Sequence, residues 1–340
     1  MTSLGYYLPN RNWPANMLLN PSTTMSGTPG RKQMITTYRN RRRIAILVIS
    51  ASALTLGACT SSLVLGTAYN EAAKRTADRV KSFADFDSEQ RQEIDQSFQS
   101  FLQWHRVSEL PAYSAILNNV ATTLQSDQSI SEIQIDQWFD TIEQRGQRAR
   151  ECSPLGGASG FLTEMAGWQI QQLGNKLRTN RSEQYERFSK TSAEDRRKRR
   201  REWMISWSSR AGIEMNDTQK LLLDNTLAQQ TSMGERRFKL WTDWTEQFIS
   251  LLNDRESEQF PGLVQSHIDS LWNLTERNYP QEWNQNRELW QGFAHEFLNG
   301  LSVDQKNALV NNIVSISKTV TTLSKKRSRR AKPVCFRESL

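Results

Sequence analysis

Apolar side chains between residues 60 and 324 recur every three or four positions, the spacing that places them on one face of an α-helix. The period-two alternation of half-buried strands is absent from this region. We therefore predict an all-α fold, either a multi-helix bundle or an elongated helical array. We interpret the stripes as core rather than as an aromatic cofactor box, so no cofactor is expected. Three stripes are Ile94, Phe98, Phe101 and Leu102; Phe238, Trp241, Trp244, Phe248 and Leu251; and Leu309, Ile313, Ile316, Val320 and Leu323.

Helix starts recur in one form, a small polar residue followed two or three positions later by an acid or Gln. The small side chain can accept hydrogen bonds from free backbone N–H groups, and an acid complements the positive end of the helix dipole. Such starts occur at Asp87, Ser129 to Ser131, Ser192, Asn216 and Ser302. The predicted helices span 63–83, 88–106, 109–125, 130–150, 157–178, 182–210, 216–229, 231–253, 256–277, 281–299 and 302–324.

An export motif lies near the N-terminus. Four arginines within residues 39–43 precede the apolar run 44–56, which is the order of regions in a secretory signal. The run ends in Leu56-Gly57-Ala58-Cys59, which resembles the lipobox of bacterial lipoproteins. That resemblance implies cleavage before Cys59 and lipidation of its sulfur. Thr60 follows in place of the Asp that retains enteric lipoproteins at the inner membrane, so we expect an outer-membrane protein facing the periplasm.

The alternative interpretation of this segment is an uncleaved membrane span, because apolar and small residues continue through Leu63-Val64-Leu65. Ser61 and Ser62 interrupt that stretch, and the strongly apolar part is shorter than the ~20 residues that a span needs. We expect translation to start at Met34, which leaves residues 1–33 as a disordered extension or a wrongly assigned start. The predicted organisation is a signal peptide over 34–58, a helical domain over 59–324 with a subdivision near 152–157, and a basic tail over 325–340.

The formal net charge of +8 is unevenly distributed. Residues 1–58 contain seven Lys or Arg and no acid, and residues 325–340 contain seven Lys or Arg and one Glu. Residues 59–324 contain 30 basic and 35 acidic side chains, so the body is mildly acidic. A nucleic-acid partner is therefore not expected, and the lipobox also places the body outside the cytoplasm.

The sharpest charge cluster within the body is a run of six consecutive basic residues. Six positions at 100° each surround a helix, so they form no single stripe. Acids at 194 and 195 precede bases at 198 and 199 by four residues, the favourable order for helical ion pairs. We expect a solvated helix, and the alternative is contact with phospholipid headgroups, lipopolysaccharide phosphates or peptidoglycan carboxylates. The run is Arg196, Arg197, Lys198, Arg199, Arg200 and Arg201.

Several short motifs follow in a characteristic order. They are Ala68-Tyr69-Asn70, Phe86-Asp87-Ser88-Glu89-Gln90, Trp104-His105-Arg106 and Glu109-Leu110-Pro111-Ala112-Tyr113, and later a basic helix leading to Trp203 and the box Thr218-Gln219. This order resembles a family of all-helical proteobacterial lipoproteins whose domain has no known function. The resemblance implies a periplasm-facing helical domain tethered to a membrane, and it implies no reaction.

No motif of an enzyme or a metal site is complete. His295-Glu296 lacks the second His of a zinc-protease helix, and no Cys-x-x-Cys pair is present. The segment 156–160 has neither the Gly-Lys-Ser/Thr of a phosphate loop nor the pattern of a nucleophile elbow. We therefore expect no metal and no enzymatic activity.

One constellation allows two interpretations. His105 lies four residues before Glu109, so a carboxylate could hold an imidazole in a proton-transfer unit or a binding cleft. The structural alternative is a capped helix corner, in which His105 and Arg106 end one helix and Ser108 caps the next. We favour the corner. The residues of this candidate cleft or corner are Trp104, His105, Arg106, Glu109 and Tyr113.

Two cysteines remain besides Cys59. A disulfide between Cys152 and Cys335 would suit an oxidising compartment and would tether the basic tail. The alternative, which we favour, leaves residues 325–337 as a free arm for anionic envelope polymers.

The function expected from these observations is that of a lipid-anchored envelope protein with a helical interaction or scaffold domain. Its partners would be the membrane, through the lipid, and envelope proteins, lipopolysaccharide or peptidoglycan. The alternative is an envelope enzyme acting on peptidoglycan or lipid, for which His105 and Glu109 are the candidate residues.

Overall fold

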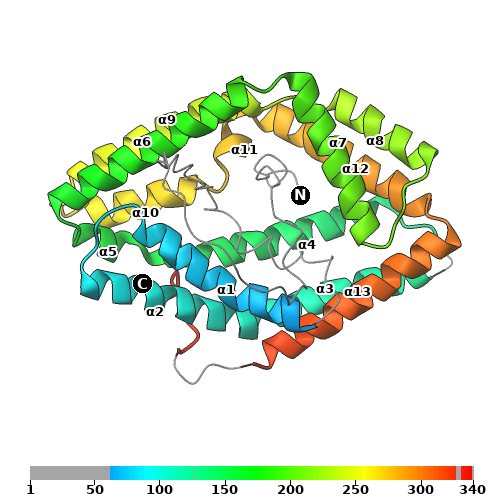
Figure 1. The fold of residues 1–340 in the computed structure, drawn as a ribbon, viewed down its shortest axis with the longest axis horizontal. Helices are drawn as coiled ribbons and strands as arrows, with labels where there is room; N and C mark the ends of the chain where they lie inside the picture. Colours follow the sequence, from blue (N-terminus) through cyan, green and yellow to red (C-terminus); the bar gives the residue numbers. More distant parts are fainter. Residues whose placement is uncertain (1–61, 127, 327–330, 339–340) are drawn as a thin grey trace, which may run out of the picture.

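A computed structural model describes residues 62–126, 128–326 and 331–338 of the chain. These residues form an all-α fold, as predicted (Figure 1). The predicted signal segment and the predicted lipobox ending at Cys59 lie outside these residues. No helix among them is both long and apolar enough to cross a membrane. The helices are α1 (Ser62–Lys81), α2 (Ser88–Trp104), α3 (Leu110–Gln125), α4 (Glu132–Glu151), α5 (Ser159–Thr163), α6 (Gly167–Ser189), α7 (Ala193–Arg210), α8 (Asp217–Gln229), α9 (Gly234–Asn253), α10 (Phe260–Ser270), α11 (Leu274–Asn278), α12 (Pro280–Asn299) and α13 (Val303–Ser324).

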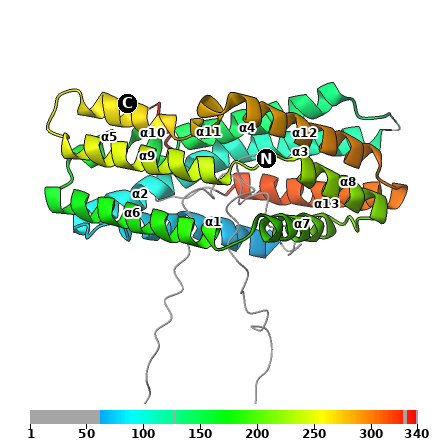
Figure 2. The ribbon, with the colours of Figure 1, turned by 90° about the horizontal axis from the view of Figure 1, so that it is seen from above.

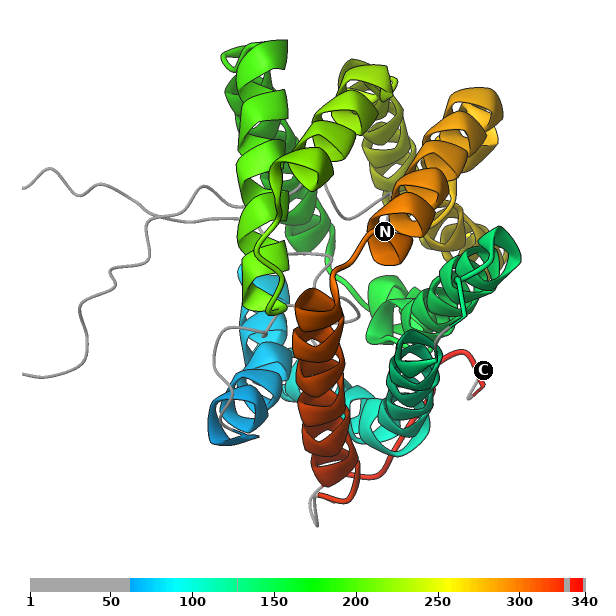
Figure 3. The ribbon, with the colours of Figure 1, turned by 90° about the vertical axis from the view of Figure 1, so that its right-hand side faces the viewer.

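The helices form an elongated body with two long sides (Figures 2 and 3). α1, α6 and α7 lie along one side, and α4, α10, α11 and α12 lie along the other. α3 and α13 pack along each other, where the hydroxyls of Ser114 and Ser317 are 2.8 Å apart. The body is therefore an extended array of packed helices.

The predicted start signals are confirmed as helix caps. The side chain at each cap accepts a hydrogen bond from the backbone N–H three residues later, which satisfies a donor that the helix leaves free. Four of the five caps are the predicted start residues themselves. The fifth, Ser131, is the last residue of the predicted start Ser129 to Ser131. The five caps are Asp87, Ser131, Ser192, Asn216 and Ser302.

Three predicted helices are wrong in their extent. The helix expected over 157–178 is instead a short 3₁₀ turn (Pro154–Gly157), the short α5 and the first half of α6. α6 continues through Thr179 and Asn180 to residue 189, and α7 begins after the cap Ser192, so the helix expected over 182–210 is divided between α6 and α7. The helix expected over 256–277 is divided between α10 and α11.

Two large hydrophobic cores, besides a small one around Trp104, lie inside the described part of the body. One contains Ile94 of α2, Ile170 of α6 and Phe260 of α10, and the other contains Leu124 of α3, Leu223 of α8 and Val310 of α13. Each core draws on segments from both sides of residues 152–157. The cores therefore do not follow a division of the chain at that point.

Candidate functional site

The constellation predicted around His105 lies on one continuous helix rather than at a corner. α2 leads into a single π turn, His105–Glu109, and the π turn leads into α3 without leaving helical backbone angles. The N–H of Leu110 donates to the carbonyl of His105, five residues back. Pro111 has no N–H and its ring would clash with the carbonyl four residues earlier, so a wider turn suits this position. The predicted corner is wrong, and no side chain caps α3.

His105 is fully buried inside the body. Its Nδ1 lies 2.8 Å from the hydroxyl of Tyr69 on α1, and its ring meets the ring of Tyr113 edge-on at 5.5 Å. Burial, with a smaller contribution from the nearby Arg106 guanidinium, lowers the pKa of His105 to about 4. His105 is therefore neutral at pH 7 and works as a hydrogen-bonding core residue.

Arg106 fixes α1 against the end of α13. Its guanidinium lies over the ring of Tyr69, with 5.4 Å between Cζ and the ring centroid, and it donates to the side chain of Asn70. It also donates to the carbonyl of Lys326 at 3.3 Å. Burial raises the pKa of the Tyr69 hydroxyl, and the positive charge of Arg106 only partly offsets that effect. The hydroxyl therefore stays protonated.

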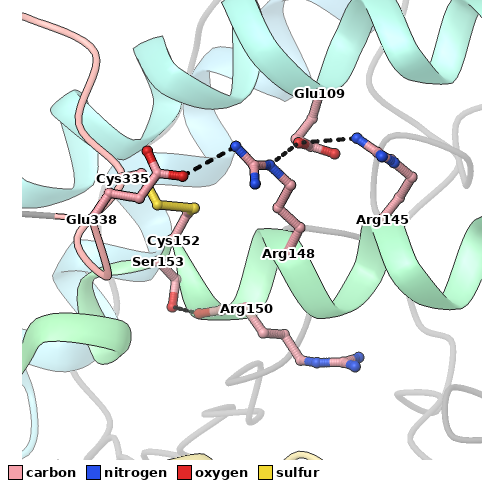
Figure 4. Close-up of a disulfide and its surroundings, with 8 residues drawn as sticks. All are labelled: Glu109, Arg145, Arg148, Arg150, Cys152, Ser153, Cys335 and Glu338. Atoms are coloured by element: carbon pink, nitrogen blue, oxygen red, sulfur yellow. Dashed lines mark hydrogen bonds and ion pairs between the residues drawn. A yellow bond between two sulfur atoms is a disulfide. The ribbon is translucent and has the colours of Figure 1, made fainter.

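Glu109 is a buried carboxyl that faces two arginines of α4 (Figure 4). Its Oε1 lies 3.4 Å from Nε of Arg148 and 3.9 Å from Nη1 of Arg145. Neither carboxyl oxygen has a hydrogen-bond partner among the described residues. Burial raises the pKa of Glu109, and the two guanidinium groups lower it by less. The two arginines thus offset only part of the cost of burying the Glu109 carboxylate away from water.

The carboxylate–imidazole unit, the other interpretation of this constellation, does not form either. The π turn adds a residue to the helical repeat, and the Glu109 oxygens make no hydrogen bond to His105. Nε2 of His105 has no hydrogen-bond partner among the described residues. Burial, and next the neighbouring Glu109, raise the pKa of the Tyr113 hydroxyl. The cluster holds two protonated phenols, a neutral imidazole and a buried carboxyl, and its central groups are closed to solvent.

Three contributors to this cluster were not identified as such from the sequence. Tyr69 belongs to the motif Ala68-Tyr69-Asn70, which is its signal in the sequence, but the motif does not say which residue it contacts. Arg145 and Arg148 lie on α4 at a spacing that many surface helices share. Their role depends on how α4 packs beside the π turn.

The C-terminal segment is tied down beside this cluster. Cys152, at the end of α4, is joined to Cys335 by a disulfide, so the favoured interpretation of the tail as a free arm is wrong for residues 331–338. The backbone N–H of Val334 donates to the carbonyl of Ser100 on α2 at 3.3 Å. Arg148 makes a second ion pair with Glu338 at 3.2 Å, so it connects the buried Glu109 to the tail (Figure 4).

Trp104 completes the contact between the π turn and the tail. It belongs to a small core with Phe101, Cys152 and Cys335, and Arg148 lies over its ring at 5.8 Å. Cys152, Cys335 and Glu338 also form a group of potential metal ligands within the described residues. The sulfurs of the two cysteines form the disulfide and cannot act as thiolate ligands, so the oxidised group does not suit zinc.

The basic run lies on α7, a helix without a buried residue among those described. Arg196 donates to backbone carbonyls at the end of α6, and Arg201 pairs with Asp224 of α8. The expected pairs of Glu194 with Lys198 and of Asp195 with Arg199 are absent from the ion pairs of the described chain. Arg197, Lys198 and Arg199 are exposed.

The described residues thus form an all-α protein that contains a buried polar cluster. Residues 82–277 match the model of the family of unknown function DUF6279, and the chain belongs to that family. The matched region includes the π turn and the basic run. Neither a curated protein nor a solved structure matches the chain.

Proposed function

We propose that the protein is a lipid-anchored lipoprotein of the cell envelope, with a periplasm-facing helical body that serves as an interaction or scaffold domain. The sequence Leu56-Gly57-Ala58-Cys59, placed behind a basic and an apolar region, carries this proposal. α1 begins at Ser62, so a lipid on Cys59 would hold the body close to the membrane surface. Thr60 favours the outer membrane as its destination.

The disulfide supports an oxidising compartment. Structural disulfides persist in secreted and periplasmic proteins and are rare in the reducing cytosol of mesophiles. Cys152 and Cys335 are both buried at the bond, as a structural disulfide requires. The compartment and the anchor are thus supported by separate parts of the chain.

The buried cluster favours a structural body over an envelope enzyme. A general acid or base has to reach its substrate within hydrogen-bond distance. The side chains of His105 and Glu109 are both fully buried, and they make no hydrogen bond to each other. We therefore assign the cluster a role in fixing α1, α4 and the tail around the π turn.

Lipidation is tested by labelling cells with radioactive palmitate. The wild type should incorporate label and Cys59→Ser should not, because the thioether forms on that sulfur. Cys335→Ser serves as the matched control, since it removes a different thiol and should keep the label. Globomycin should cause a larger precursor to accumulate, and an unchanged mass would contradict the anchor. Sedimentation with inner-membrane markers on a sucrose gradient would contradict the proposed outer-membrane destination.

A further inference from the structure

Positive charge is concentrated along one side of the body. α1, α6 and α7, which lie together on that side in Figures 2 and 3, contain 15 basic and 7 acidic side chains. α4, α10, α11 and α12 on the other side contain 5 basic and 10 acidic side chains. The acidic total for residues 59–324 therefore hides a separation of charge between two faces.

We propose that the side formed by α1, α6 and α7 is a membrane-docking surface that binds the anionic phospholipid headgroups of the membrane holding the anchor. The inference rests on the proposed function for the identity of that membrane. Negatively charged headgroups attract clusters of Lys and Arg, and an acyl chain combined with a basic patch binds more stably than either signal alone. The charged side also carries the helix nearest to Cys59.

The cations available for headgroups are clearest on α7. Arg197, Lys198 and Arg199 are exposed, and no ion pair among the described residues occupies them. Arg196 and Arg201 are held by α6 and α8, as described above, so they anchor the helix to the body. The run is thus divided into side chains that fix α7 and side chains that remain available for a partner.

The start of α1 adds further positive charge near the anchor. A Cβ added at Gly66 would lie 3.4 Å from Leu323 and 3.9 Å from Nζ of Lys326, so the end of α13 lies beside this part of α1. Lys325 and Lys326 are exposed there, and Lys74 is exposed one turn beyond Asn70 on α1. A lipid on Cys59 would bring this cluster to the headgroup region.

α6 contributes an exposed aromatic residue to the same side. Trp168, in the first turn of α6, is 53% exposed, although most of the large apolar side chains of the described chain are covered. Trp is enriched at the boundary between membrane and water because its ring is apolar and its N–H is polar. An exposed Trp on α6 is the residue type expected at such a boundary.

The test uses the chain from residue 59 onward with Cys59→Ser, so that binding depends neither on the lipid nor on the basic and apolar segment before it. It is mixed with vesicles of phosphatidylcholine alone or of equal parts phosphatidylcholine and phosphatidylglycerol, and the bound fraction is measured by flotation. We expect binding only to the anionic vesicles, weakened by salt. Arg197→Glu, Lys198→Glu and Arg199→Glu together should reduce this binding about tenfold or more, because they replace three attractive charges with three repulsive ones.

The matched control is Lys220→Glu, Lys239→Glu and Arg277→Glu, which changes the net charge equally on α8, α9 and α11. This variant should bind as the parent does, and both variants should keep the parent's melting temperature. Equal loss in the two variants, equal binding to both vesicle types, or binding to isolated peptidoglycan in place of vesicles would overturn the proposal. Absence of palmitate labelling would contradict the anchor and leave the vesicle result intact, so the two failures are distinguishable.

Discussion

His105 shows how the packing of one side chain sets its chemistry. It accepts or donates one hydrogen bond, to Tyr69, and otherwise lies among aromatic rings. The desolvation that lowers its pKa to about 4 also removes it from use as a base near neutral pH. A residue that appears catalytic in a sequence motif is here a neutral part of the core.

The lowered pKa of His105 predicts a loss of stability in acid. An unfolded His has a pKa near 6.5, so between pH 6.5 and about 4 the unfolded chain binds a proton that the folded chain does not. The contribution is fully present above pH 6.5 and is lost as the pH falls toward 4. Urea unfolding at pH 7 and pH 4.5 should show a loss of about 2–3 kcal/mol from this group.

His105→Gln should reduce that acid-dependent loss by a similar amount, because Gln does not titrate. Glu109 acts in the opposite direction, since a carboxyl with a raised pKa favours folding on protonation, but it is present in both proteins. His105→Asn, which also lacks a titrating group, is the comparison and should show the same reduced loss. Parallel profiles for wild type and His105→Gln would contradict the assignment.

The residues of the cluster could be predicted from the sequence only in part. Trp104, His105, Arg106, Glu109 and Tyr113 are close in sequence, and the structure places them on one helix. Their partners on α1 and α4 are fixed by tertiary packing, which a single sequence does not show. The π turn was missed because a proline after a polar stretch also indicates the start of a new helix.

At the scale of elements, helix starts were predictable because a cap is a local interaction. What the sequence did not show is that two pairs of starts bind each other. Gln90 and Gln169, in the first turns of α2 and α6, exchange amide hydrogen bonds of 2.6 and 3.2 Å. Gln219 and Gln305, in the first turns of α8 and α13, do the same at 2.9 and 3.0 Å. Each pair joins helices that are distant in sequence.

The Gln219–Gln305 pair is predicted to couple α8 to α13. Gln219 is buried and also donates to the carbonyl of Gly300, so its loss leaves polar groups without partners. Gln219→Ala should cost about 1–3 kcal/mol, and a double-mutant cycle with Gln305→Ala should give a coupling energy of about 1 kcal/mol. The measurement is urea unfolding of the four proteins. Strict additivity would show that the two caps act independently.

Helix ends were predicted less well, because they depend on the neighbours that the chain meets. α6 continues through Asn180, a residue that also ends helices, while its first half packs against α9, where a Cβ added at Gly174 would lie 3.5 Å from Ile249. The segment over 271–273 leaves the helix although no proline lies within it. Helices that start with a side-chain cap are therefore predicted better than α6, α10 and α11, which start without one.

At the scale of the whole molecule, the C-terminal segment connects helices that belong to distant parts of the chain. It donates a backbone hydrogen bond to α2 at Ser100, its disulfide joins α4, and Arg337 pairs with Asp269 of α10. The sequence allowed the disulfide but could not show that the two α-carbons approach each other. In the structure they lie 4.2 Å apart.

The disulfide is predicted to stabilise the body substantially because it closes a long loop. Cys152 and Cys335 are separated by 183 positions, for which the chain-entropy model gives about 5 kcal/mol, and measured losses of native disulfides are about 2–5 kcal/mol. The double variant Cys152→Ser and Cys335→Ser should therefore have a free energy of unfolding lower by about 2–5 kcal/mol and a lower urea midpoint. Its helical circular dichroism should remain, since the caps and cores remain. A reducing agent should lower the unfolding midpoint of the wild type toward that of the double variant and leave the double variant unchanged. Equal midpoints with and without reductant would mean that hydrogen bonds and ion pairs hold the segment, and that the covalent bond adds little.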